Sequence, residues 1–145
     1  MNKKSRDIMT EDVVCCTSED TVREAAQLMK TEDIGPVLVV DNQQSRTLVG
    51  IVTDRDLALK VIADGRDPQT TRVGDVMSKK LVTCYADDDV EIAMKAMAQY
   101  QLRRIPVVEE NMRLVGIISQ ADIATRVNAP EETAEVVKEI SQENT

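Results

Sequence analysis

The sequence predicts an α/β (α+β) protein built from two pseudo-symmetric β-α-β-β-α repeats that pack sheet to sheet, with an added C-terminal helix. The first observation is a repeated phrase: LVGIVTDRDLA at residues 48–58 returns as LVGIISQADIA at residues 114–124. The second is that Asp-Ile-Met at residues 7–9 returns as Asp-Val-Met at residues 75–77. Two ordered copies of both phrases indicate a duplication into two small halves.

Each half shows the same order of predicted elements. Short apolar strands are expected at residues 13–16 and 81–84. Apolar residues at the i, i+3, i+4, i+7 spacing then predict one helix per half, formed by Val22, Ala25, Ala26 and Met29 and by Val90, Ala93, Met94 and Met97. Two more strands and a second helix follow, the latter near residues 54–64 and 120–127, and Gly65 is suited to end the first of these helices.

These elements set the expected domain boundaries. We expect repeat 1 at residues 5–66, a linker at 67–73, repeat 2 at 74–128 and a C-terminal helix at 129–145. Pro130 and the two glutamates after it favour a helix start. Because this last helix has no counterpart in the first half, we expect it to serve packing or a dimer contact.

Composition excludes several classes of protein. Of the 145 residues, 42% are hydrophobic, which is enough for a core, but there is no Phe or Trp, so Val, Ile, Leu, Met and Ala must build it. The net charge of −8 argues against a general nucleic-acid partner. The apolar run at 37–40 is too short to span a membrane, and the basic start lacks the apolar region of a signal peptide. We therefore expect a cytoplasmic protein.

The residue types also argue against an enzyme. The chain contains no His, which removes His-based zinc sites and Ser-His or Cys-His nucleophile pairs. Its three cysteines are Cys15, Cys16 and Cys84, and adjacent strand residues point to opposite faces, so the first two cannot easily share a metal. We expect structural, reduced thiols, no dedicated metal site and no required cofactor.

The end of each repeated phrase forms a strand-to-helix corner. Thr53 and Ser119 can each cap a helix, with Asp56 and Asp122 three residues later. This spacing is that of a capping box, which is a purely structural device. It also fits a ligand site, because a carboxylate at such a corner can accept hydrogen bonds from hydroxyl groups. The two interpretations are compatible.

Taken together over residues 5–127, these features resemble a tandem pair of cystathionine-β-synthase (CBS) domains, the Bateman module, in its small stand-alone bacterial or archaeal form. The resemblance is carried by Asp-Ile/Val-Met at each start, by Leu/Pro-Val-Val-Asp/Glu in the middle and by Gly-h-h-Thr/Ser-x-x-Asp at each end, where h is apolar. It implies a regulatory module that senses AMP, ADP, ATP, NAD or S-adenosylmethionine in the cleft between the repeats.

The resemblance also implies the site residues. Ribose would contact Thr53 and Asp56 in the first half, and Ser119 and Asp122 in the second. Phosphate would contact basic residues before the Pro-Val strand, where this chain has Arg103 and Arg104, joined by Arg55 at the first corner. The adenine slot would be lined by Met9, Val14, Cys16, Ile105 and Pro106.

The two implied sites are unequal. The first combines Thr53, Asp56 and Arg55 with both arginines, whereas the second has only Gly35 and Pro36 in their place. We expect a homodimer that binds an adenine nucleotide and regulates a protein partner, without nucleic acid or membrane. The alternative is a structural or protein-interaction module with vestigial sites. The acidic pair Asp54 and Asp56 favours this alternative, because its negative charge repels a phosphate.

Overall fold

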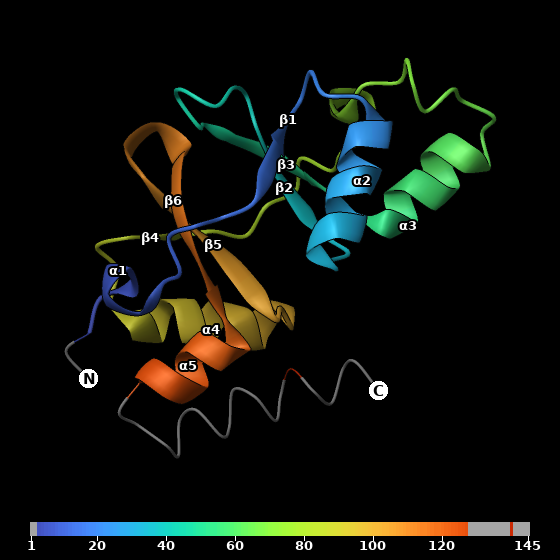
Figure 1. The fold of residues 1–145 in the computed structure, drawn as a ribbon. Coiled ribbons are helices and arrows are strands. Elements are labelled where there is room, and N and C mark those ends of the chain that lie inside the picture. The colour runs from blue at the N-terminus through green and yellow to red at the C-terminus, as the bar shows by residue number, and fades with distance from the viewer. Residues whose placement is uncertain (1–2, 128–139, 141–145) are drawn as a thin grey trace. The chain divides into compact units, whose positions relative to one another are not determined.

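The computed structural model describes residues 3–127 and residue 140, and the chain forms two compact units (Figure 1). We call Val14–Leu81 the central unit. The described residues of Met1–Val13 and Val82–Thr145 form the terminal unit. Apart from Ile140, the C-terminal helix expected at residues 129–145 lies outside the described residues.

The central unit holds a three-stranded sheet with the order β1-β2-β3. β1 (Cys15–Thr17) runs parallel to β2 (Val37–Val40), and β2 pairs antiparallel with β3 (Leu48–Val52). All four β2 side chains are buried, as expected for a strand with a neighbour on each side. α2 (Val22–Glu32) connects β1 to β2 and begins at Thr21, whose hydroxyl accepts the Glu24 N–H at 3.2 Å.

The helix after β3 is less regular than the sequence suggested. α3 covers Asp54–Leu57, and a π-helix over Ala58–Ile62 replaces the expected α-helical continuation to residue 64. The Arg66 N–H then donates to the Val61 carbonyl at 2.9 Å and the Gly65 N–H to the Ile62 carbonyl at 3.2 Å. With φ of 69° at Gly65, these bonds form a Schellman ending, which confirms the predicted role of this glycine.

The terminal unit repeats the plan with the sheet order β4-β5-β6. Its strands are β4 (Cys84–Tyr85), β5 (Arg104–Glu109) and β6 (Arg113–Ser119), where β4 and β5 are parallel and β5 and β6 antiparallel. Its helices are α1 (Ser5–Ile8), α4 (Val90–Tyr100) and α5 (Gln120–Arg126), and short 3-10 turns lie at Glu110–Met112 here and at Val73–Asp75 in the central unit. The predicted α/β class and duplication are confirmed.

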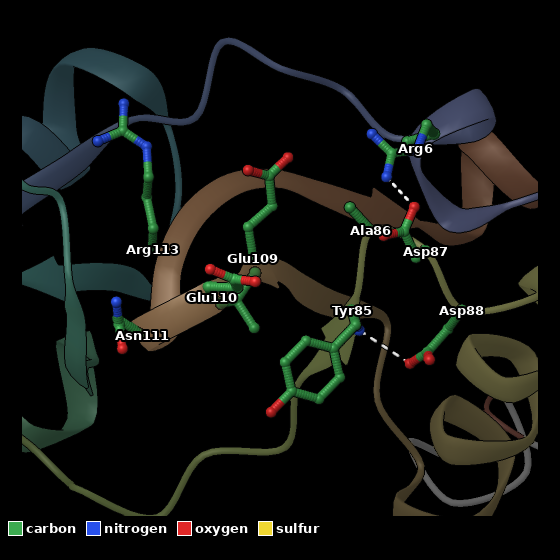
Figure 2. Close-up of a pocket in the computed structure, with 10 residues that line it drawn as sticks. Arg6, Tyr85, Ala86, Asp87, Asp88, Glu109, Glu110, Asn111 and Arg113 are labelled. Atoms are coloured by element: carbon green, nitrogen blue, oxygen red, sulfur yellow. Dashed lines mark hydrogen bonds and ion pairs between the residues drawn. The ribbon is translucent and has the colours of Figure 1, made fainter.

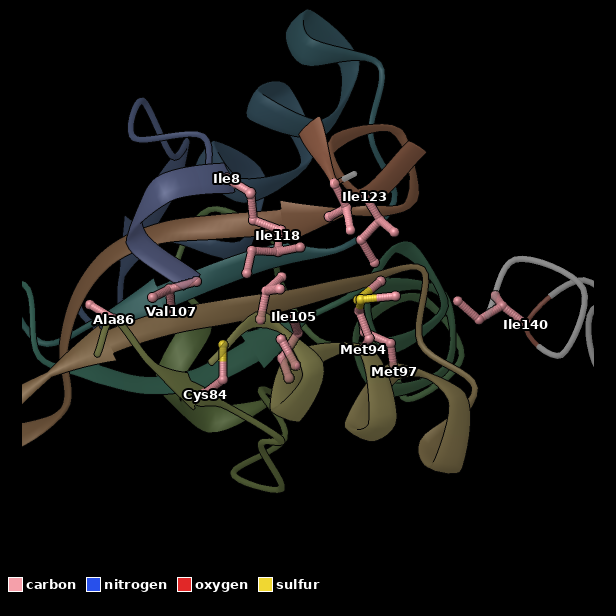
Figure 3. Close-up of a cluster of buried hydrophobic side chains, with 13 residues drawn as sticks. Ile8, Cys84, Ala86, Met94, Met97, Ile105, Val107, Ile118, Ile123 and Ile140 are labelled. Carbon is pink, nitrogen blue, oxygen red and sulfur yellow. The ribbon is translucent and has the colours of Figure 1, made fainter. Parts of the chain in front are cut away.

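Each unit has its own hydrophobic core, built without Phe or Trp. The predicted apolar stripe of α4 faces the core of the terminal unit, where Met97 and Ile105 are fully buried (Figure 3). Ile140 belongs to the same core. In the central unit Val22, Ala25 and Met29 of the predicted α2 stripe pack with Val37, Val39 and Val52. The prediction was wrong for Ala26, which is exposed, because Leu28 packs against the core instead.

The starting segment of each repeat packs in the unit that holds the other repeat's sheet. Thr10 and Ile117 exchange backbone hydrogen bonds of 2.8 and 3.0 Å in the terminal unit. In the central unit Ser78 and Ile51 do the same at 2.8 and 2.9 Å. The residue after each Asp-Ile/Val-Met phrase therefore pairs with the last strand of its unit, β6 or β3, through an isolated antiparallel bridge.

The glycine of each repeated phrase makes this docking possible. A Cβ placed on Gly50 would lie 2.6 Å from the Met77 sulfur and 2.8 Å from the Ser78 carbonyl oxygen. On Gly116 it would lie 2.5 Å from the Met9 sulfur and 3.0 Å from the Thr10 carbonyl oxygen. Only a residue without Cβ allows such an approach, because a backbone carbonyl cannot swing aside.

We expect Gly50→Ala to destabilise the protein by about 1–3 kcal/mol, because the new methyl group overpacks the contact with Met77 and the Ser78 carbonyl. Urea unfolding followed by circular dichroism measures this. Lys95→Ala, on the exposed side of α4, is the control and should stay within about 0.5 kcal/mol. Equal stability of the two variants would show that the close approach is not a constraint.

Candidate functional site

The first candidate corner comprises residues 53–56 and is called the Thr53 corner. The Thr53 hydroxyl accepts the Asp56 N–H at 3.1 Å, and Asp56 Oδ2 accepts the Thr53 N–H at 2.9 Å. This reciprocal pair is a capping box, and it sits where β3 turns into α3. It holds the Asp56 carboxylate in a fixed orientation with Oδ1 left for another partner.

That partner is Lys60, which the sequence analysis did not single out. Its ammonium lies 3.2 Å from Asp56 Oδ1 and donates to the Val76 carbonyl at 2.9 Å. The Lys60 side chain remains 47% exposed. The signal was present as a basic residue four positions after the aspartate, which is the spacing of neighbours on one helix face.

The second candidate corner comprises residues 119–122 and is called the Ser119 corner. It has the same capping box: the Ser119 hydroxyl accepts the Asp122 N–H at 3.1 Å, and Asp122 Oδ2 accepts the Ser119 N–H at 3.0 Å. Arg126 occupies the place of Lys60 and lies 3.8 Å from Asp122 Oδ1. Its guanidinium donates to the carbonyls of Ile8 and Met9 at 3.0 and 3.1 Å.

The predicted phosphate residues are all exposed. Arg55, Arg103 and Arg104 form no ion pair within the described part of the chain, which also fits a plain solvated surface. The Arg103 carbonyl accepts the Gln120 N–H at 3.1 Å, just as the Gly35 carbonyl accepts the Asp54 N–H at 3.2 Å. The assignment of both arginines to the Thr53 corner stays a prediction.

The predicted adenine-lining residues differ in accessibility. Met9 and Val14 are half-buried. Pro106 is buried, and Cys16 and Ile105 belong to the cores of the central and terminal units. Met9 and Val14 are therefore the residues of this set whose side chains are partly accessible to a ligand.

The three cysteine thiols all have raised pKa values. All three are free thiols. Burial raises the pKa of Cys16 to about 12 and that of Cys84 to about 11, so both stay protonated at neutral pH. Burial also raises the pKa of Cys15, which is half-buried. Across residues 3–127 and 140, no group of three His, Cys, Asp or Glu side chains could hold a metal ion.

A surface groove of about 720 Å³ lies in the terminal unit, away from the predicted residues (Figure 2). Its lining carries four acids, Asp87, Asp88, Glu109 and Glu110, against two arginines, Arg6 and Arg113. Arg6 is already paired with Asp87, and Asp88 Oδ2 accepts the Tyr85 N–H at 2.9 Å. This excess of negative charge disfavours an anionic ligand.

Comparison with known proteins identifies the family. Residues 6–63 and 73–129 each match the CBS domain, and the chain belongs to this family, which confirms the resemblance seen in the sequence. The CBS domain-containing protein YhcV of Bacillus subtilis (strain 168) is 40% identical to it over 139 residues, 96% of each chain. No helix in the described residues is both long and apolar enough to cross a membrane.

Solved structures share the fold. Hypoxic Response Protein I, crystallised with two coordinated zinc ions, matches with a TM-score of 0.73 and 36% identity, covering 86% of this chain and 99% of that one. A CBS domain pair crystallised with 5′-methylthioadenosine and S-adenosyl-L-methionine matches with a TM-score of 0.66 and 27% identity, covering 84% and 93%.

The thiol environments predict an order of chemical labelling. In the folded protein at pH 8, iodoacetamide should modify Cys15 before Cys16 and Cys84, because the thiolate is the reactive form and the last two are buried with raised pKa values. Peptide mass spectrometry of timed samples measures this. In urea the three rates should converge. Labelling of Cys16 or Cys84 as fast as Cys15 in the folded protein would contradict their burial.

Proposed function

We propose that this protein is a non-enzymatic regulatory module that binds an adenosyl ligand at the Thr53 corner. The observation that carries the proposal is the Asp56 carboxylate. Its Oδ2 is fixed by the Thr53 N–H, and within the described residues its Oδ1 meets the exposed Lys60 ammonium alone. A carboxylate oxygen held in this way can accept hydrogen bonds from the neighbouring hydroxyl groups of a ribose.

Charge supports a ligand that carries phosphate. Arg55 belongs to the Thr53 corner, and its guanidinium group is exposed and has no acid partner among the described residues. A planar guanidinium forms two parallel hydrogen bonds with a phosphate, which suits AMP, ADP, ATP or NAD. S-adenosylmethionine and 5′-methylthioadenosine share the same ribose, and the similar CBS pair bound to both supports the adenosyl class as a whole.

A regulatory role is favoured over catalysis by what the corner contains. The chain has no His, and the thiols of Cys16 and Cys84 are buried and protonated. The corner therefore pairs a carboxylate with a cation, without an activated nucleophile beside a base. Such a pair is suited to binding.

We expect the double variant Thr53→Ala, Asp56→Ala to lose affinity for 5′-methylthioadenosine by about 10- to 100-fold, because charge-assisted hydrogen bonds to the ribose disappear. Isothermal titration calorimetry measures it, with AMP, ATP, NAD and S-adenosylmethionine as further ligands. Lys95→Ala is the control, and circular dichroism checks that each variant is folded. The proposal fails if the wild-type protein gives neither heat nor a thermal shift with any of these ligands at millimolar concentration.

A specific observation favours protein binding as a second candidate function. Ile62 is 71% exposed in the central unit, and Ile92 and Tyr100 are 51% and 54% exposed on α4. Each of these apolar side chains would leave water if a protein partner covered it, which favours association. We propose a second copy of the chain as the first partner, with a regulated protein as a further one.

Native mass spectrometry of the freshly purified protein tests the homodimer. We expect a dimer at micromolar concentration, and Ile92→Ser with Tyr100→Ser should shift it toward monomer because both side chains lose apolar contact area. A monomer at every concentration would exclude the homodimer. The same spectrum reports any retained ligand, so the two candidate functions are tested independently.

A further inference from the structure

We infer that the two corners have different roles: the Thr53 corner takes the ligand, and the Ser119 corner is a structural joint that fastens the N-terminal segment to α5. The inference rests on the proposed function and adds its stoichiometry, which is one adenosyl ligand per chain. It follows from the different partners of the Asp56 and Asp122 carboxylates, which hold equivalent positions in the two repeats.

The Asp122 carboxylate is already engaged. Its Oδ2 accepts the Ser119 N–H at 3.0 Å, and the Thr10 hydroxyl lies 3.2 Å from Oδ1 and 3.3 Å from Oδ2. The Thr10 contacts are long for O–H···O bonds, so their main effect is to cover the carboxylate. Asp122 is 7% exposed and is one of the few buried polar residues of the described chain.

Arg126 ties the same carboxylate to the N-terminal segment. Besides its contact with Asp122, it donates to the carbonyls of Ile8 and Met9, and its own carbonyl accepts from Lys3 Nζ at 2.6 Å. The backbone bridge between Thr10 and Ile117 is a further contact between the N-terminal segment and β6. Residues 3–10 are thus held by side chains and backbone of both β6 and α5.

The Thr53 corner lacks this cover. Ser78 stands where Thr10 stands in the other unit, and within the described residues its hydroxyl accepts the Lys80 N–H at 3.3 Å rather than reaching Asp56. The Asp56 side chain is 18% exposed, against 10% for Asp122. Its remaining oxygen lies 3.2 Å from the Lys60 ammonium. Lys60 and Arg126 are equally exposed, at 47%, so the difference in cover comes from Thr10.

The cost of ligand entry therefore differs between the corners. At the Thr53 corner a ribose replaces one ion pair, in which the Lys60 side chain is 47% exposed and therefore partly screened by solvent. At the Ser119 corner it would have to part Thr10 from Asp122 and compete with an arginine already bound to two carbonyls. Buried groups left without partners make that exchange unfavourable.

Calorimetry with 5′-methylthioadenosine on the full chain tests the stoichiometry. The probe lacks phosphate, so it reports the ribose and adenine contacts alone. We expect one equivalent per chain. Asp56→Asn should lower the affinity by about tenfold or more, because the charged acceptor is lost. Asp122→Asn should leave the affinity within about threefold but lower Tm by about 5 °C.

Hydrogen exchange adds a readout that a general loss of stability would not reproduce. Under native conditions Asp122→Asn should speed exchange of the Thr10 amide, which donates to the Ile117 carbonyl, whereas Asp56→Asn should leave it unchanged. If Asp122→Asn fails to fold, Thr10→Ala serves instead, with the same expectations for affinity and exchange.

Three results would overturn the inference. Two equivalents of ligand per chain would show that both corners bind, and loss of binding in Asp122→Asn alone would reverse the assignment; in both cases the proposed function would stand. Equal exchange rates of the Thr10 amide in both variants would contradict the structural role of the Ser119 corner. If the wild-type protein binds no adenosyl probe, the proposed function itself fails and the single-site stoichiometry fails with it.

Discussion

Both units depend on close packing of a methionine side chain against a glycine, Met77 against Gly50 and Met9 against Gly116. Because Gly50 and Gly116 have no Cβ, Met77 and Met9 can lie directly on the last strand of each sheet. This docking brings the carbonyls of Val76 and Ile8 within reach of the basic residues after each corner. The corners are thereby shaped by a segment distant in sequence as well as by their own capping boxes.

The difference between the corners comes from two pairs of residue identities. Arg126 offers several donors in one plane, so it serves two carbonyls and still lies near Asp122, whereas the Lys60 ammonium is a single compact charge on a flexible stem. Thr10 covers Asp122, whereas the Ser78 hydroxyl accepts a hydrogen bond from the backbone N–H of Lys80. Under the inferred division of roles, these small substitutions within a duplicated frame close one corner and leave the other open.

Local features could be predicted from the sequence and long-range ones could not. The caps at Thr53 and Ser119 and the ending at Gly65 depend on residues within a few positions, so their spacing sufficed. The docking of each starting segment links residues far apart along the chain. Because the two repeats have similar sheets, the sequence does not indicate which sheet each segment joins. The π-helix over Ala58–Ile62 could not be predicted because an ordinary helix also satisfies the apolar pattern, whereas the i,i+4 spacing of Asp56 and Lys60 was available in the sequence.

If the Thr53 corner binds a ligand as proposed, Lys60 connects that binding to the rest of the central unit. A ribose at Asp56 takes the oxygen that Lys60 neutralises, yet Lys60 also holds the Val76 carbonyl, next to the methionine seated on Gly50. Because the Lys60 side chain is 47% exposed, solvent screens part of its attraction to Asp56, which lowers the cost of displacing it. A coupling of about 1.4 kcal/mol already changes an affinity tenfold, so even one rearranged ammonium contributes a useful fraction of a regulatory signal.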